Sequence, residues 1–168
     1  ALDSNIATVT LAIASVNDAP QGVSTTVTTL EDTAYVFQLA DFGFSDALDA
    51  GSNSGANNFS AVTFGNLPLA GSLMLDGVAV TSGQSISVAD IASGLLVFAP
   101  ANNANGTAYA NFTFQVQDDG GVTNGGVDRD PDAKTITSRV GRARFCAHAD
   151  TKPRVQTMKL FAHPTIIF

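Results

Sequence analysis

The strongest pattern in the sequence lies between residues 109 and 117, where bulky residues recur at alternate positions. Phe112, Phe114 and Val116 form this pattern, and Tyr109 precedes them. Successive side chains of a β-strand point to opposite faces, so a repeat of two predicts a strand with one buried side. The chain therefore has to build a sheet around this segment, with a second layer that covers its apolar face.

Shorter segments of the same kind fill most of the chain before residue 100, with turn residues between them. Asp76-Gly77 suits the tight turn of a β-hairpin, and residues 88–94 suit a single helical turn that ends at Gly94. Many short strands with almost no helix predict an all-β sandwich of about seven or more strands. The expected strands cover residues 7–13, 22–30, 33–39, 59–64, 72–75, 78–80, 85–88, 95–98 and 109–117.

Charge divides the chain into two parts. Residues 1–128 contain twelve carboxylates, eleven of them Asp, and no Lys or Arg, whereas residues 129–168 contain all eight basic residues and three acids. A segment with a dozen acids and no cation cannot neutralise itself by ion pairs. It either tolerates self-repulsion or recruits metal ions.

A stiff joint follows the first expected strand. Proline fixes its own φ and favours an extended residue before it, so Ala19-Pro20 predicts an extended connector. Asn17 and Asp18 place side-chain oxygens on this connector, which suit either an ordinary Asx turn or a hard cation.

A short internal sequence similarity supports a repeat organisation. Ile-Ala-Thr-Val-Thr at residues 6–10 returns as Ala-Lys-Thr-Ile-Thr at residues 133–137, a spacing of 127 residues. We therefore expect residues 1–20 to hold the last strand of a preceding repeat plus a linker, and residues 21–137 to form one whole repeat. Residues 138–168 are then an atypical basic C-terminal tail.

Five motifs follow one another in the chain: Val16-Asn17-Asp18-Ala19-Pro20, Leu30-Glu31-Asp32-Thr33-Ala34, and the stretches at residues 41–46, 71–80 and 112–120. Together they resemble the cadherin-like, VCBS-type tandem repeats of large bacterial surface adhesins of the RTX type. The resemblance covers about residues 1 to 137. It implies a Greek-key sandwich of the immunoglobulin or cadherin kind, an extracellular place at the cell surface, and calcium that stiffens the joints between repeats.

The resemblance also implies a Ca²⁺ site at one pole of the sandwich. Ca²⁺ takes six to eight oxygen ligands, from carboxylates, amides, carbonyls and water. The longer acidic linker of animal cadherins is reduced here to Asn-Asp-Ala-Pro, which leaves the number of ions open. The expected ligands are Asn17 and Asp18 from the linker, Glu31 after the first strand, Asp118 or Asp119 at the end of the long strand, and Asp32 as a helper.

A second acidic set is Asp128, Asp130 and Asp132, whose alternate spacing is similar to the opening of a calcium loop. Arg129 and Pro131 separate these acids, and a solvated turn is the alternative interpretation. Asp46 and Asp49 are less favoured candidates for the same chemistry.

The expected function is a calcium-binding adhesin repeat that acts as a structural spacer or as a cell-adhesion or biofilm module. Its partners are then neighbouring repeats of the same chain, and a surface polysaccharide or another adhesin. The alternative is a carbohydrate-binding module of a secreted polysaccharide-active protein, for which Tyr35 or Tyr109 would form a stacking platform in this chain without Trp.

Other classes have little support in the sequence. No catalytic triad, dyad or cofactor motif occurs, so we expect no enzyme, and no apolar run reaches the length of a membrane span. Cys146, His148 and Asp150 lack the fourth ligand of a zinc site, so a chance cluster is the favoured interpretation. The tail after Thr137 is expected to be foreign to the repeat, frame-shifted or vector-derived. The alternative is a genuine tail that docks on the acidic sandwich or on nucleic acid.

Overall fold

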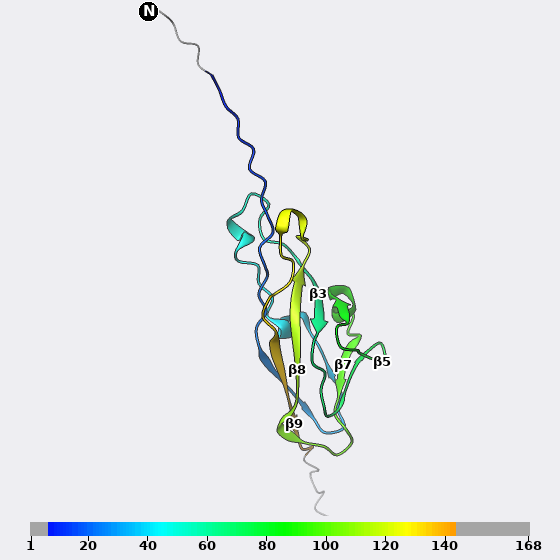
Figure 1. Cartoon of the computed structure of the whole chain (residues 1–168). Coiled ribbons are helices and arrows are strands. Elements are labelled where there is room, and N and C mark those ends of the chain that lie inside the picture. Colours follow the sequence, from blue (N-terminus) through cyan, green and yellow to red (C-terminus); the bar gives the residue numbers. More distant parts are fainter. Residues whose placement is uncertain (1–6, 144–168) are drawn as a thin grey trace, which may run out of the picture.

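The long alternating segment becomes β8 (Gly106–Asp118), the longest strand of the protein. The computed structural model describes residues 7–143, and in it Phe112, Phe114 and Val116 point from β8 into the core and are fully buried. β8 lies in the middle of a five-stranded sheet (Figure 1). In sheet order its strands are β1 (Thr25–Leu30), β9 (Lys134–Gly141), β8, β3 (Phe59–Phe64) and β6 (Ser85–Ser87).

A four-stranded sheet completes the sandwich, and the predicted all-β class is confirmed. Only the β8–β9 and β4–β5 neighbours follow each other in sequence, and the other sheet neighbours are distant in the chain, as in a Greek-key sandwich. The order of the second sheet is β2 (Tyr35–Val36), β7 (Leu96–Ala99), β4 (Ser72–Leu75) and β5 (Val78–Ala79). The helical pieces are α1 (Val88–Ala92) and the 3-10 turns η1 (Leu39–Phe42), η2 (Asp49–Gly51) and η3 (Thr123–Gly125).

Phenylalanine rings fill the space between the two sheets. Phe42 from η1 meets Phe114 of β8 edge to face, with ring centroids 5.1 Å apart. Phe98 from β7 lies 5.9 Å from Phe112 of β8, which joins the second sheet to the first. Each pair adds about 0.5 to 1.5 kcal/mol to the gain from burial. The phenylalanine rings of the core therefore form one connected cluster, and aliphatic side chains complete the core around it.

Several local predictions are confirmed. The hairpin between β4 and β5 turns at Asp76 and Gly77, which both have positive φ, as a type I′ turn requires. The short helix α1 is capped by Ser87, whose Oγ accepts a hydrogen bond from the Asp90 amide at 3.1 Å. Gly94 then takes a positive φ of 73° after the helix ends. These signals are local, so the sequence alone carries them.

Two predicted strands differ in the structure. Residues 7–13 form no strand, because this segment has no neighbouring strand among the described residues. The strand expected over residues 33–39 is reduced to β2, because Asp41 Oδ2 accepts hydrogen bonds from the Gln38 amide at 2.8 Å and from the Tyr35 hydroxyl at 3.0 Å. These bonds turn the chain into η1.

The last strand passes the boundary expected at residue 137. β9 runs parallel to β1 and continues to Gly141, and Val140 is buried in the core. Residues 138–141 therefore belong to the sandwich. The rest of the basic tail from residue 144, with Cys146, His148 and Asp150, lies outside the described residues.

Asp130 ties the start of the sandwich to its last strand. Its carboxylate is buried, accepts a hydrogen bond from the Gly22 amide at 2.8 Å and pairs with Lys134 at 3.3 Å. The other carboxylate oxygen of Asp130, Oδ1, accepts a hydrogen bond from the Asp132 amide at 2.9 Å. Both oxygens are therefore satisfied within the protein, which makes Asp130 a structural residue.

Replacing Asp130 by Ala should lower the free energy of unfolding by about 2 to 4 kcal/mol, because the buried Gly22 amide loses its acceptor and Lys134 loses its partner. Urea denaturation measures this change. Asp132→Ala is the control: the Asp132 side chain is exposed, so its removal should cost no more than about 0.5 kcal/mol. Equal effects of the two substitutions would contradict the role of Asp130.

No helix among residues 7–143 has the length and apolar character needed to cross a membrane.

Candidate functional site

The linker of residues 16–20 is fixed to one pole of the sandwich by Asn17. Its Nδ2 donates to Asp118 Oδ1 at 3.1 Å and to the Val127 carbonyl at 2.8 Å. The Asn17 carbonyl in turn accepts from the Val127 amide at 2.9 Å. Gly120 makes this approach possible, because a Cβ at that position would collide with the side chains of Asn17 and Asn57. The Asp-Asp-Gly-Gly run that begins at the last residue of β8 therefore holds the linker in place.

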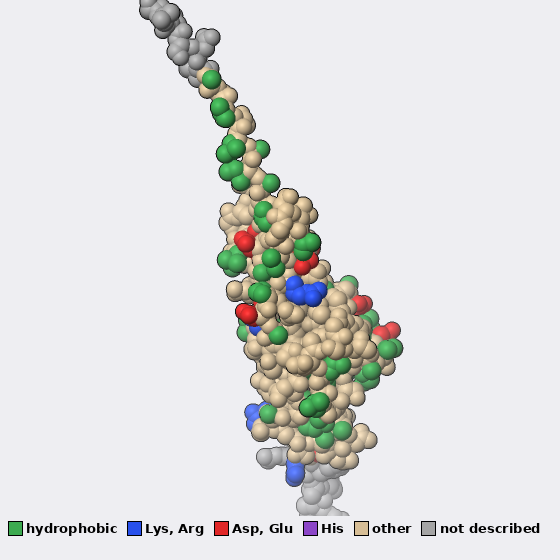
Figure 2. Space-filling model, viewed as in Figure 1, with side chains coloured by type: hydrophobic (Ala, Val, Ile, Leu, Met, Phe, Trp, Pro, Cys, Tyr) green, Lys and Arg blue, Asp and Glu red, His purple; other side chains and the backbone are tan. Residues whose placement is uncertain are grey.

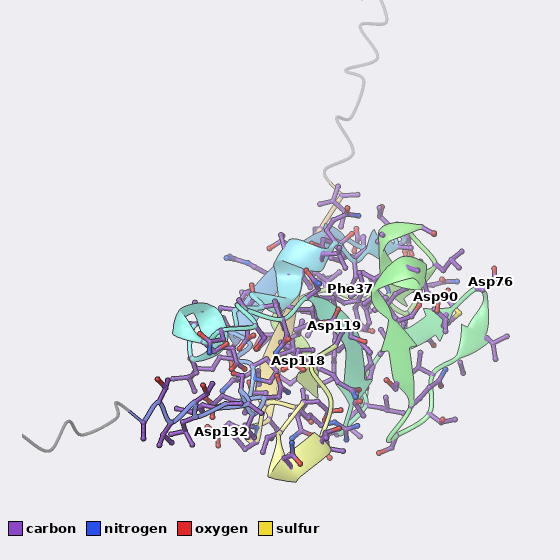
Figure 3. The ribbon with its side chains drawn as sticks, turned by 90° about the horizontal axis from the view of Figure 1, so that it is seen from above. Phe37, Asp76, Asp90, Asp118, Asp119 and Asp132 are labelled. Carbon is purple, nitrogen blue, oxygen red and sulfur yellow. The ribbon has the colours of Figure 1, made fainter. Side chains whose placement is uncertain are left out.

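The loop that carries Asp46, Asp49 and Asn57 contacts the linker at the same pole. The Asp18 amide donates to Asp49 Oδ2 at 2.7 Å, and the Asn57 amide donates to Asp46 Oδ2 at 2.5 Å. The Asn57 side chain also donates to Asn17 Oδ1. Linker, loop and strand end therefore meet at one pole. Figure 3 looks onto this pole and shows Asp118 and Asp119 between the loops that carry η2 and η3.

Three carboxylates at this pole are buried without a cation beside them. Asp46, Asp49 and Asp118 are 7%, 2% and 2% exposed. Within the described part of the chain, the ion pairs all involve Lys134, which pairs with other acids. Burying a charge without a partner is costly, so the pole is electrostatically incomplete as it stands.

Two carboxylate oxygens at this pole make no hydrogen bond to the described residues. Asp46 Oδ1 and Asp118 Oδ2 are buried and have no hydrogen-bond partner among the described residues. Burial raises the pKa of Asp118, and the charges of Asp46 and Asp128 raise it further, against hydrogen bonds from Gly120 and Asn17 that lower it. A positive ion at this point would relieve both the desolvation and the repulsion.

The donor set suits a hard cation that accepts mixed oxygen ligands. No group of three or more His, Cys, Asp or Glu side chains in residues 7–143 is arranged to hold a metal ion. The free oxygens at the pole belong to the carboxylates of Asp46 and Asp118, and the Asn17 side chain adds an amide oxygen that accepts from Asn57. Ca²⁺ accepts this mixture, whereas Zn²⁺ prefers nitrogen and sulfur ligands.

Asp119 follows Asp118 in the chain, but its carboxylate bonds to Asn58 rather than to the linker. Asp119 Oδ1 accepts from the Asn58 amide at 2.7 Å, and Oδ2 accepts from the Asn58 side chain at 3.1 Å. The hydrogen bonds from the Asn58 side chain and amide lower the pKa of Asp119. Its role is to hold the strand that follows the loop.

The structure does not bring Glu31 and Asp32 to this pole, which corrects the expected ligand set. Glu31 Oε1 accepts from the Ala143 amide at 3.2 Å, and Asp32 Oδ1 accepts from the Asn103 amide at 2.8 Å. Both contacts lie at the Gly106 end of β8. Asp118 lies at its other end, and 13 residues at about 3.3 Å each separate the two ends by about 40 Å. The physical reason is that β1 runs along the sandwich and delivers Glu31 to the far pole.

The second acidic set does not converge on one point either. Asp128 Oδ2 accepts from the Gln117 side chain at 2.9 Å, Asp130 holds Gly22 and Lys134, and the Asp132 side chain is exposed. Only Asp128 contributes to the pole, through the effect of its charge on Asp118.

The residues that sequence reasoning underestimated are Asp46, Asp49 and Asn57. They lie in a stretch of small and polar residues that is typical of a surface loop. The available signal was the lack of any Lys or Arg before residue 129, because every Asp that folding buries there lacks a cation nearby in sequence.

Both tyrosines of the chain serve the packing of the sandwich. The Tyr35 hydroxyl donates to Asp41, and the Tyr109 hydroxyl accepts from the Ala101 amide at 3.0 Å. Burial, with the hydrogen bond to Asp41, raises the pKa of Tyr35 to about 12. Each ring also packs against a core phenylalanine. Both tyrosine side chains are half-buried, and their hydroxyls are engaged within the protein.

Comparisons with protein-family models, curated proteins and solved structures give no match to this chain.

Proposed function

We propose that this chain is a repeat unit of an extracellular bacterial adhesin, in which Ca²⁺ stiffens the joint between the linker and the sandwich. The module is a spacer or adhesive unit without catalytic activity, and its partners are neighbouring repeats and surface polysaccharide or another adhesin. The order of the five sequence motifs supports this cadherin-like, VCBS-type class.

One observation carries the proposal: the carboxylate oxygens Asp46 Oδ1 and Asp118 Oδ2 are buried and have no hydrogen-bond partner among the described residues, where Asn17 of the linker meets the sandwich. A cation at this point would bind atoms from the linker, the loop and the strand end together. Asp46, Asp118 and Asn17 would hold it, with Asp49 close by on the Asp18 amide. Its charge would replace the missing basic side chain.

Calcium should raise the melting temperature of the chain, because an ion that binds only the folded state stabilises it. A concentration of about 100 times the Kd adds about 2.7 kcal/mol. Extracellular calcium modules bind at about 0.1 to 1 mM, so scanning calorimetry with 0 to about 10 mM CaCl₂ covers the range.

The location of the site is tested with Glu31→Gln, which removes a charge at the far pole. This variant should keep the full calcium response, since Glu31 contacts Asn105 and Ala143 rather than the linker. A melting temperature that does not change at any calcium concentration would overturn the proposed function.

A further inference from the structure

The segment of residues 7–13 leaves the sandwich as an extended chain with an uncovered apolar side. Val9, Leu11 and Ile13 are 89%, 79% and 74% exposed. In Figure 1 this segment runs away from the sandwich, and Figure 2 shows hydrophobic side chains along it. An alternating segment of this kind buries one face when it is paired in a sheet, and here that face has no cover.

The same three positions are the inward face of β9. The spacing of 127 residues that relates residues 6–10 to residues 133–137 places Val9, Leu11 and Ile13 on Ile136, Ser138 and Val140. These residues of β9 are 0%, 0% and 2% exposed. The exposed face of the segment is therefore the face that the equivalent strand buries.

The pairing of β9 shows which strands flank a strand with this sequence pattern. Ile136 pairs with Thr25 of β1 on one side and with Phe112 of β8 on the other. Ser138 lies between Val27 and Ala110, which are both buried. A strand like β9 is thus an inner strand, with one parallel and one antiparallel neighbour.

We propose that residues 7–13 are the last strand of a second sandwich of this type, and that they insert between its equivalents of β1 and β8. Val9, Leu11 and Ile13 then point into the core of that sandwich. In this chain the equivalent place is filled by β9, so the segment has to find it in a different sandwich. The inference rests on the proposed tandem arrangement, and it fixes which strand crosses from one unit to the next.

A tandem protein tests this insertion directly. Residues 1–134 of one copy are joined to residues 8–168 of a second copy, so that residues 8–13 follow Lys134 in the place of Thr135–Val140. Lys134 is kept because it pairs with Asp130. We expect both copies to fold, and hydrogen exchange at the Leu11 amide to slow by about 100-fold or more relative to the single chain, because the strand becomes paired on both sides.

The matched control joins residue 134 to residue 9 instead. A shift of one residue turns every side chain of a strand to the opposite face, so the apolar residues would leave the core. In this protein the first copy should stay unfolded and be degraded by protease, with no protection at Leu11. Equal protection in the shifted and unshifted proteins would overturn the proposal.

Leu11 replaces the smaller Ser138 in the tandem protein, so a second tandem protein carries Leu11→Ser and restores the inward residue of β9. Folding of either unshifted protein supports the proposal, and an unfolded first copy in both overturns it. All measurements are made with EGTA present. Their outcome is therefore independent of calcium binding, and a failure of the calcium site leaves this test unaffected.

Discussion

Asp118→Asn is expected to make the protein more stable than the wild-type chain in EGTA and less stable in millimolar calcium. Without calcium the substitution removes a buried charge that has one unpartnered oxygen, which should add about 1 to 3 kcal/mol to the free energy of unfolding. With calcium it removes a proposed ligand, so the rise in melting temperature expected for the wild-type chain should be lost. Calorimetry of both proteins with and without calcium measures the reversal.

The raised pKa of Asp118 fixes the direction in which the free energy of unfolding changes with pH. Burial raises the pKa of Asp118 in the folded protein, so its contribution to stability is complete below the unfolded pKa and is lost as pH rises through the folded pKa. In EGTA, the stability advantage of Asp118→Asn over the wild-type chain should therefore grow as pH rises through that window. Calcium should abolish the advantage at neutral pH, because the ion compensates the charge.

Asp76→Asn is the matched control for this substitution. Asp76 is an exposed residue of the β4–β5 hairpin, and Figure 3 shows it away from Asp118. Asn accepts the positive φ of this position, so the variant should keep both the wild-type stability and the full calcium response. An Asp118→Asn protein that behaves like Asp76→Asn would refute the role of Asp118.

Phe42→Ala should have the largest effect on stability of any single change discussed here, a loss of about 3 to 5 kcal/mol. Phe42 is fully buried, and its ring lies 5.1 Å from Phe114, 5.9 Å from Phe37 and 6.3 Å from both Phe59 and Phe64. A small domain has only about 5 to 15 kcal/mol in total. Urea denaturation at 25 °C measures the change.

The same substitution should weaken calcium binding as well. The Phe42 ring anchors η1 against β8. Backbone hydrogen bonds from Val23 to Phe42 and between Ser45 and Gln21 then align the segment that carries Asp46 with the linker. Leu69→Ala is the control, because Leu69 is fully exposed and its loss should change stability by no more than about 0.5 kcal/mol. A cost for Phe42→Ala as small as that of the control would contradict the aromatic core.

Strands whose signals are local were predictable from the sequence. The alternation in β8, the Asp76-Gly77 turn and the Gly94 stop each depend on a few adjacent residues, and the structure confirms them. Residues 7–13 carry an equally good strand pattern and still form no strand. A strand exists only when another strand supplies its hydrogen bonds, and pairing is not a local property.

The candidate site was predictable only in part for the same reason. The Asn17 side chain does meet the strand end at Asp118, as the resemblance implied, whereas the Asp18 amide bonds to Asp49 of the loop. Glu31 was misplaced because its position depends on the direction and length of β1, and Asp46 was underestimated because only packing buries it.

The sequence by itself determined the class of the fold and the electrostatic problem of this protein: alternating strands that must form a sandwich, and twelve acids with no base before residue 129. The tertiary structure decided which of those acids matter. By packing the loop after η1 against the end of β8, it buries Asp46 and Asp118 together and leaves Glu31 at the opposite end. The physical reason is that a charge becomes costly only when folding removes its water, and that depends on contacts between segments distant in the chain.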